Sequence, residues 1–414
     1  MAASRRQLLL AAGVVAGLLL GGTACGTVHA PGVGPPRAAS SGASGSAGPS
    51  AVHPGRSASI SSPLSEAGAT AETPASPVPA GFAATSVTWV SPDEAFVLGT
   101  APCAHAPCTV IARTLNRGAS WTALRGPAVP VGAPLQAGAV WGIRFATPEH
   151  GFVFGDGLWE TTDGGQRWAR AVTPPGSVLS LAIVQAQVLA VIARCAADGG
   201  CPQPGTLARR ALSGGPWFFA ASGAGIRLLD PDDLIATQAG VAAVVVDHDV
   251  LVTADGGRTL SRNPVPCPAL APVPSVAVTS ATGLAIVCTG EGFGGHTIKH
   301  VYVSDDDGAH WALAGQPSPD GDAGTLAATT AGQLVIATAS AASWLFYSGD
   351  AGASWRIVSQ QDDGGMGWAD LGFTTAADGV VVRGPADSDG NVTQRPGQLF
   401  LTDDAGATWH RVRF

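Results

Sequence analysis

Residues 304–311 read Ser-Asp-Asp-Asp-Gly-Ala-His-Trp, and this eight-position pattern returns along the chain. It runs hydroxyl, any residue, Asp, any residue, Gly, any residue, small or polar residue, Trp. Further copies lie at residues 114–121, 161–168, 253–260, 348–355 and 402–409. The third position is occupied by Asn116, Asp163, Asp255, Asp306, Asp350 and Asp404. One eight-residue motif therefore sets the period of the chain.

Each position of the motif has a physical role in a tight hairpin. A short carboxylate at the third position accepts backbone N–H bonds within a turn. The Gly takes the left-handed backbone conformation that other residues avoid. The Trp starts the next strand, and its large ring has to be buried against a neighbouring repeat. We expect largely buried rings at the equivalent positions Trp121, Trp168, Trp311, Trp355 and Trp409.

The motif resembles the Asp-box, or BNR repeat, of sialidases, sortilin-type receptors and the photosystem II assembly-factor propellers. Six copies in register make the resemblance specific, although residues 253–260 end in Leu260 instead of Trp. In those families the box builds the fold at the blade periphery, away from the ligand site. The resemblance thus implies a fold and gives the third-position residues a structural role.

The spacing of the copies predicts the number of repeats. One interval, between the copies that begin at residues 161 and 253, is about twice the others. A degenerate copy at Leu212–Trp217 fills this gap, because it keeps a Gly and the Trp while lacking the Asp. Seven units then fill Phe82–Phe414.

Strand patterns precede the motif copies. Residues 87–99 align without gaps with residues 143–155, and residues 371–383 repeat the pattern. Each segment reads as an alternating strand, a turn and a more apolar strand. With the strands that flank the motif, each unit holds four strands, A to D. Such units close radially because they cannot cover their own faces.

The sequence therefore predicts an all-β, seven-bladed β-propeller of four-stranded antiparallel blades. Eight blades is the alternative, if the residues before 81 supply extra strands. No spare strand is evident for a hydrogen-bonded closure of the ring. We expect packing between whole blades to close it.

The N-terminus predicts export. Residues 1–24 read as a signal peptide, with Arg5 and Arg6 before an apolar run. These arginines resemble a twin-arginine signal, so the general and twin-arginine routes both stay open. Cys25, directly after Ala24, resembles the lipidated cysteine of bacterial lipoproteins, which implies a protein on the outer side of the cell membrane. Plain secretion after cleavage at Ala24 is the alternative.

The remaining chain divides near residue 80. Residues 25–80 are rich in Gly, Ser, Ala and Pro, which is typical of a flexible stalk, and residues 81–414 carry the repeats. The net charge is −8 and Lys299 is the single lysine, so the chain lacks the basic surface that nucleic-acid binding requires. We expect a monomer that needs neither cofactor nor metal.

Six cysteines remain beyond the N-terminal one: Cys103, Cys108, Cys195, Cys201, Cys267 and Cys288. An even number in an exported chain predicts three disulfides. Fifteen connectivities are open, and sequence proximity favours pairing consecutive cysteines in the order given. A metal site is the competing interpretation, but the spacings are not those of zinc ligands and no His cluster accompanies them.

The loops between strands B and C carry the irregular residues of the chain, and in a propeller of this strand order they share one face. Loops on a rigid scaffold commonly carry binding residues, although tolerated insertions would look the same. We predict a ligand-binding face there, with indoles for stacking and a small polar cluster. Core packing is the alternative for either indole. The predicted ligand-binding residues are Trp141, His296, Lys299, His300 and Trp368.

The predicted function is a binding or assembly module on the cell surface, with an unknown envelope protein or glycan as partner. The alternative is a glycan-processing hydrolase of the sialidase superfamily. Sialidases carry an Arg-Ile-Pro segment, substrate-binding arginines and a Tyr nucleophile paired with Glu. This chain lacks Arg-Ile-Pro, and its tyrosines, Tyr302 and Tyr347, come just before motif copies. Glu149, Glu160 and Glu291 show no partner for a two-carboxylate mechanism, so we predict no catalytic residues.

Overall fold

The computed structural model describes residues 76–104, 107–195, 205–219, 235–238, 240–246, 248–268, 274–322, 324–362, 364–387 and 397–414. In these residues every regular element is a β-strand, and no helix is long and apolar enough to cross a membrane. The predicted signal peptide, Cys25 and almost all of the predicted stalk lie outside the described residues. So do Cys201 and residues 388–391 of the acidic loop in the last repeat.

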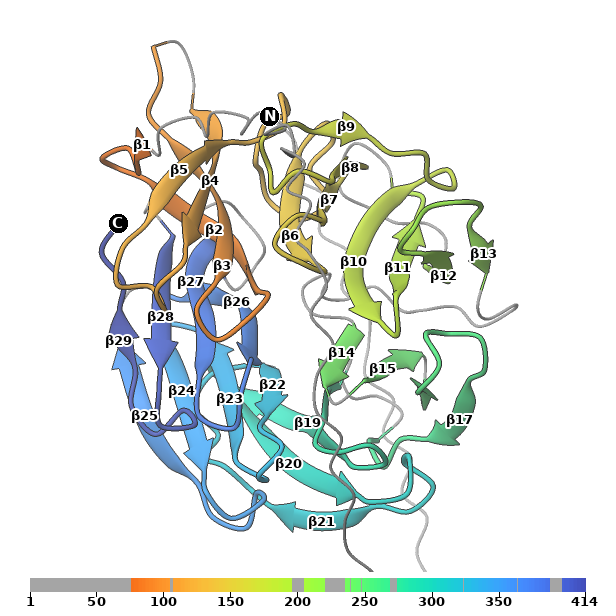
Figure 1. Ribbon diagram of the computed structural model, residues 1–414. Coiled ribbons are helices and arrows are strands. Elements are labelled where there is room, and N and C mark those ends of the chain that lie inside the picture. Colours follow the sequence, from red (N-terminus) through yellow and green to blue (C-terminus); the bar gives the residue numbers. More distant parts are fainter. Residues whose placement is uncertain are drawn as a thin grey trace, which may run out of the picture. The chain divides into compact units, whose positions relative to one another are not determined.

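Seven sheets follow one another around a ring, from the orange blade 1 to the blue blade 7 in Figure 1. Within each blade, antiparallel strands lie in sequence order. Blade 1 holds β2 (Ala83–Trp89), β3 (Ala95–Ala101), β4 (Cys108–Thr114) and β5 (Thr122–Arg125); blade 2 holds β6 (Val140–Phe145), β7 (Gly151–Gly155), β8 (Gly157–Thr161) and β9 (Ala169–Arg170); blade 3 holds β10 (Ser177–Val184), β11 (Gln187–Ala193), β12 (Thr206–Ala211) and β13 (Phe218–Phe219).

The remaining four blades repeat this plan, which confirms the predicted seven-bladed propeller. Blade 4 holds β14 (Ile235–Gln238), β15 (Val241–Val246), β16 (Asp249–Thr253) and β17 (Ser261–Pro264); blade 5 holds β18 (Ser275–Val278), β19 (Leu284–Phe293), β20 (His296–Ser304) and β21 (Ala312–Gly315); blade 6 holds β22 (Thr325–Ala328), β23 (Leu334–Ala339), β24 (Ser343–Ser348) and β25 (Arg356–Gln361); blade 7 holds β26 (Met366–Phe373), β27 (Gly379–Asp387), β28 (Gln398–Thr402) and β29 (His410–Arg411).

One short strand lies outside this plan. β1 (Ser76–Pro77) pairs antiparallel with β5, at the outer edge of blade 1. The residues before 81 thus add a fifth strand to blade 1, and the described residues form no eighth blade.

Blades 1 and 7 meet without sharing a strand in the described part of the chain. One backbone bond crosses the seam, from the Ala84 amide to the Gly397 carbonyl oxygen at 3.1 Å. The ring of Phe414 packs edge-on against Phe82 and Trp121, with centroids 4.7 and 5.2 Å away. The ring is therefore closed mainly by side-chain packing, as the sequence predicted.

The hydrophobic core lies in the seams between blades. A representative cluster joins Ala277 and Val287 of blade 5 to Leu326 and Phe346 of blade 6, all buried. Such seams explain why the strands read as apolar on both faces, since each sheet is covered by a neighbour on either side.

The repeated motif folds as a hairpin with one internal hydrogen-bond pattern. In residues 348–355 the Ser348 hydroxyl donates to Asp350 Oδ1 and accepts the Gly352 amide, both at 2.8 Å. The same carboxylate accepts the backbone amide and the hydroxyl of Ser354, at 2.8 and 2.6 Å. Ala351 and Gly352 are both left-handed, with φ of 54° and 92°, so the chain reverses in two residues. The polar groups of the motif are thus used within the hairpin.

The motif Gly also faces the preceding blade. A Cβ at Gly406 would lie 2.5 Å from Val335 Cγ2 of blade 6. A Cβ at Gly308 would lie 2.8 Å from Val250 Cγ1 of blade 4. Only glycine satisfies both the left-handed backbone and this close approach.

The predicted burial of the motif tryptophans is correct only for Trp121, which is 8% exposed. The rings of Trp168, Trp311, Trp355 and Trp409 are half-buried, because they cover the outer ends of the seams. The fourth strand of each of these blades begins one residue after the Trp, and not at the Trp as predicted.

The motif carboxylates predict a stability change in acid. The amide of Thr259 lowers the pKa of Asp255 from 3.8 to about 2, and a side-chain hydrogen bond from His310 lowers that of Asp306 to about 2. A depressed carboxyl pKa stabilises the folded state above the unfolded-state pKa, and that contribution disappears as the pH falls towards the folded-state value. Asp306 in turn raises the pKa of His310, so the comparison starts at about pH 6, where this histidine is protonated. We expect the contribution of Asp255 and Asp306 to the urea midpoint to be constant from about pH 6 to about 4, and to fall between about 4 and 2.

The double variant Asp255→Asn, Asp306→Asn is the control for this pH dependence. It should unfold more easily at pH 7 and show a smaller fall between pH 4 and 2. An unchanged acid response in the double variant would contradict the assignment.

Candidate binding face

The two ends of each blade carry different kinds of loop. In blade 5 the pairing of β19 with β20 runs from Leu284 opposite Ser304, where the motif begins, to Phe293 opposite His296 at the other end. The motif turn therefore lies opposite the B-to-C loop. The motif turn also bonds the A-to-B turn of its own blade, as Asp307 N donates to Thr282 O at 2.9 Å. One face thus holds the motifs, and the opposite face holds the B-to-C loops.

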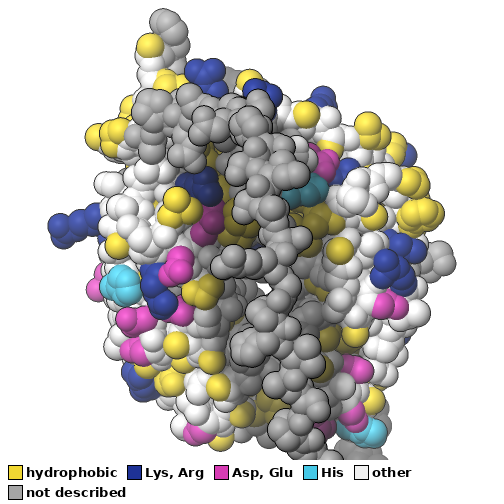
Figure 2. All heavy atoms as spheres, viewed as in Figure 1, with side chains coloured by type: hydrophobic (Ala, Val, Ile, Leu, Met, Phe, Trp, Pro, Cys, Tyr) yellow, Lys and Arg dark blue, Asp and Glu magenta, His cyan; other side chains and the backbone are white. Residues whose placement is uncertain are grey.

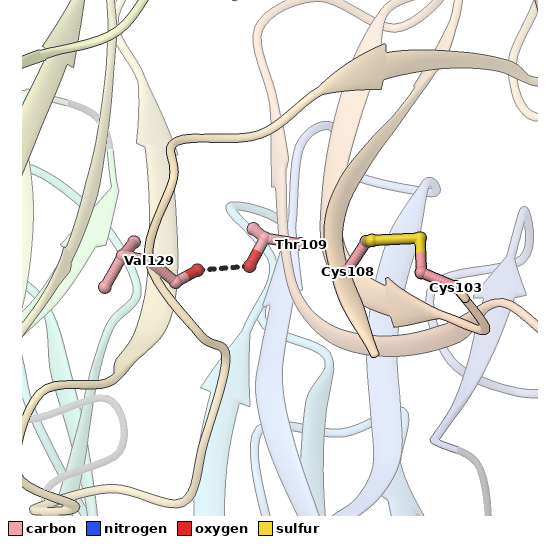
Figure 3. The surroundings of a disulfide bond; sticks show 4 residues. All are labelled: Cys103, Cys108, Thr109 and Val129. Carbon is pink, nitrogen blue, oxygen red and sulfur yellow. Dashed lines mark hydrogen bonds between the residues drawn. A yellow bond between two sulfur atoms is a disulfide. The ribbon is translucent and has the colours of Figure 1, made fainter. Parts of the chain in front are cut away.

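Disulfides hold two of the connections. Cys103 and Cys108 are bonded across the B-to-C loop of blade 1, and the Thr109 hydroxyl donates to the Val129 carbonyl oxygen on the segment that leads to blade 2 (Figure 3). Cys267 is bonded to Cys288 and ties β19 to the segment before β18. Both predicted pairings are confirmed. Cys195 is also disulfide-bonded, and its predicted partner lies outside the described residues.

The hairpin of β19 and β20 projects beyond its own sheet. Pairing with β18 ends at Val287, and pairing with β21 ends at Val301. We call residues 289–298 the arm. Its turn, Gly294 and Gly295, is left-handed with φ of 57° and 81°, and it abuts Ser340 of blade 6, because a Cβ at Gly295 would lie 2.1 Å from the Ser340 Oγ.

Two large apolar side chains of the arm face solvent. Phe293 is 71% exposed and Ile298 is 42% exposed. Aromatic side chains are frequent anchors at the centre of protein–protein interfaces, although a single exposed apolar residue does not by itself mark one. The arm is therefore a candidate contact surface on this face.

Lys299 lies at the base of the arm and is fully buried. Its three ammonium N–H donors lie within hydrogen-bond distance of four backbone carbonyl oxygens: Thr297 at 2.9 Å, Pro319 at 3.0 Å, Asp320 at 3.1 Å and Gly321 at 2.8 Å. Burial lowers the pKa of Lys299 to about 8, against the attraction of the Asp322 and Asp320 carboxylates. The lysine predicted to bind a ligand thus holds the arm to the connection between blades 5 and 6.

The two histidines of the predicted cluster flank this lysine on β20. His296 Nδ1 lies 3.5 Å from Asp320 Oδ1, and its ring lies 6.1 Å from that of Phe293. His300 is half-buried and pairs with Cys288 in the β-ladder. The structure therefore brings His296, Lys299 and His300 together on one strand.

The two predicted tryptophans lie elsewhere. Trp141 is 4% exposed and its Nε1 donates to the Leu179 carbonyl oxygen of blade 3 at 3.3 Å. Trp368 is 9% exposed and its Nε1 donates to the Thr338 carbonyl oxygen of blade 6 at 2.9 Å. Both indoles follow the alternative of core packing, because each ring fills a seam between blades and offers no face for stacking.

The central channel holds a cavity of about 310 Å³, lined by the inner strands of all seven blades. One ion pair lies in its wall, between Arg144 of blade 2 and Asp370 of blade 7, at 2.6 Å. Asp370 Oδ2 also accepts the Val87 amide of blade 1 at 2.8 Å. Three consecutive blades around the closure are thereby connected through one carboxylate.

Sequence reasoning missed this ion pair, although a signal was present. Arg144 aligns with Thr88 in the repeated strand pattern, so a charged residue replaces a small polar one in an inner strand. A charge at such a position needs a partner, because the inner strands are mostly buried. Asp370 could not be chosen as that partner from the sequence, because it is distant in the chain.

The residues considered for catalysis are not gathered at the channel. Tyr302 and Tyr347 lie on the third strands of their blades, where Tyr302 pairs with Leu313 of the outer strand. Glu160 bonds Arg210 at 3.0 Å and His150 at 2.8 Å. Asp370 is the only carboxylate among the described residues that line the cavity, and it is engaged as above.

Charges are dispersed over the face shown in Figure 2, where basic and acidic side chains lie near one another around the rim. Among the described residues, no three His, Cys, Asp or Glu side chains are grouped as metal ligands. The surface in this view thus offers no large patch of one sign.

Comparison with known proteins gives the fold and no family. No protein-family model and no curated protein matches the chain. The structure of YCF48 bound to D1 peptide is 16% identical, covers 80% of this chain and 94% of its own, and has a TM-score of 0.50. The GH74 enzyme of Niastella koreensis is 11% identical, covers 80% of this chain and 71% of its own, and has a TM-score of 0.31. This chain is thus similar to β-propellers in its fold.

Proposed function

We propose that this protein is an exported, membrane-anchored propeller that binds a protein of the cell envelope through its B-to-C loops. The observation that carries the proposal is the arm, which presents exposed Phe293 and Ile298 from a fixed base. The motif residues are already accounted for by folding, because their polar groups bond within the hairpins. The exposed side chains of Phe293 and Ile298 have no such role in the blade.

A propeller of similar fold supports this proposal. Propellers of similar architecture include YCF48, whose structure was solved with a D1 peptide bound. A hydrolase of the sialidase superfamily is the competing proposal. It would need unengaged acids at the channel, whereas the one carboxylate among the described lining residues is paired with Arg144. The geometry therefore favours binding.

Membrane anchoring is proposed from the sequence alone. Cys25 after a signal peptide supports a lipid anchor, and residues 25–75 would separate that anchor from the first described strand. An extended chain of this length reaches far beyond the membrane surface. The propeller would thus be free to meet partners on the outer side of the membrane.

One set of preparations tests both parts of the proposal. In cells, Cys25→Ser should abolish incorporation of labelled palmitate and release the protein from the membrane fraction. The purified mature protein should capture an envelope protein saturably, and should not hydrolyse aryl glycosides or sialosides. Turnover of a sialoside in proportion to the amount of propeller would instead support the hydrolase.

A further inference from the structure

We propose that the arm is a rigid knob that inserts into an apolar pocket of a protein partner, and that Lys299 is the residue that positions it. The inference deepens the proposed function, because it names the contact surface and the chemistry of the partner. It rests on the geometry of residues 289–298 and of the connection at 319–322, all of which are described.

The arm projects beyond its own sheet and carries two exposed apolar side chains. It extends beyond both neighbouring strands of blade 5, and it carries Phe293 at 71% exposure and Ile298 at 42%. A projecting aromatic side chain is the shape that fits a concave apolar pocket on another protein. The partner should therefore supply the pocket.

The base of the arm is held by a dense set of bonds. Besides the Lys299 ammonium group with its four surrounding carbonyl oxygens, the Thr297 amide donates to the carbonyl oxygens of Pro319 at 3.0 Å and Gly321 at 3.2 Å. The Thr297 hydroxyl donates to Asp322 Oδ1 at 3.2 Å. A surface element fixed before binding loses less conformational entropy when its partner arrives. The bonds at 297–299 thus suit a preformed contact surface.

Charge on the arm favours a protein over a membrane. The single lysine is buried and its donors are used, while Glu291 is exposed and Asp320 lies at the base. Peripheral membrane binding usually adds basic side chains that attract anionic lipids, and none is available here. A symmetric contact between two arms is also disfavoured, because it would bring two Glu291 carboxylates together. A pocket bordered by Lys or Arg is the complementary surface.

The first test compares two exposed apolar residues of the same blade. Phe293→Ser changes the arm, and Leu313→Ser changes β21, where Leu313 is 55% exposed. With the full mature protein as bait and solubilised native envelope as the source, Phe293→Ser should weaken capture by about thirtyfold, as expected for a central aromatic contact. Leu313→Ser should change it by less than about twofold. A photoreactive phenylalanine analogue should crosslink the partner from position 293 and not from position 313.

The second test concerns the positioning role of Lys299. Lys299→Met removes the ammonium group while keeping an unbranched side chain, so the arm should exchange its amide hydrogens faster while the other blades keep their protection. Capture should weaken, and adding Phe293→Ser to this variant should weaken it far less than in the wild-type background, because the two residues act through one surface. Additive effects would overturn the positioning role. If Lys299→Met does not fold, the comparison of Phe293 with Leu313 still decides the docking surface.

Other outcomes would overturn the arm as a knob for a protein partner. These are equal capture by Phe293→Ser and wild type, Phe293-dependent binding to vesicles of phosphatidylglycerol and phosphatidylcholine, and Phe293-dependent self-association in sedimentation. If Phe293→Ser and Leu313→Ser both captured the partner as well as the wild type, the protein would still be a binding module, but its contact surface would lie elsewhere. Glycoside turnover without any capture would instead remove the proposed function itself.

Discussion

Replacing Asp370 by Ala should lower the free energy of unfolding by about 3–5 kcal/mol, the range expected when one partner of a buried ion pair is removed. The Asp370 side chain is 10% exposed and pairs with Arg144 at 2.6 Å. It also accepts the Val87 amide, which would lose this acceptor. The loss should be measured by urea unfolding of the mature protein.

Two variants separate the causes of this loss. Asp370 has a φ of 50°, a conformation that Asn tolerates, so Asp370→Asn removes the charge with little backbone cost. It should be less destabilising than Asp370→Ala. Arg117→Ala breaks the exposed ion pair with Asp378 on the same seam and should cost under about 1 kcal/mol. If Asp370→Ala cost no more than Arg117→Ala, the channel pair would have no special role in closing the ring.

The second large effect is expected at the motif glycines. Gly406→Ala should cost about 2–5 kcal/mol, combining about 1–2 for a left-handed Ala and about 1–3 for overpacking. The φ of Gly406 is 94°, and its added Cβ would meet Val335 of the preceding blade at 2.5 Å. Thermal and urea unfolding would both report this change.

Gly332 is the matched control for this substitution. It has a φ of 86°, and an added Cβ would meet nothing within 4 Å. Gly332→Ala should therefore cost only the backbone term of about 1–2 kcal/mol. Equal losses for Gly332→Ala and Gly406→Ala would show that the motif does not pack tightly against the neighbouring blade.

The sequence predicted the fold well because the motif encodes local structure. A hydroxyl, a carboxylate and a Gly at fixed spacing determine one hairpin, and its copies count the blades. The degenerate copy at residues 212–217 still indicated blade 3 through its Gly and Trp. Two disulfides followed from proximity in the chain, as in Cys103 and Cys108.

The candidate site was less predictable, because it depends on contacts between distant segments. Lys299 read as a surface group, yet four carbonyl oxygens hold it, three of them from the next connection. The sequence left Trp141 and Trp368 open between the rim and the core, and each packs against the neighbouring blade. The exposure of Phe293 was also missed, since a Gly-rich loop does not reveal how far its hairpin extends.

We infer that the B-to-C face binds the partner and that the motifs serve only the fold. This division of roles is tested best by measuring the capture of the envelope partner and the urea unfolding midpoint of two variants. Phe293→Ser should lose the envelope partner and keep the midpoint of the wild type. Asp404→Ala removes the carboxylate that accepts the Thr408 amide and hydroxyl at 2.8 and 2.7 Å, so it should lower the midpoint and keep the partner. Loss of the partner in Asp404→Ala at an unchanged midpoint, with full capture by Phe293→Ser, would contradict the account.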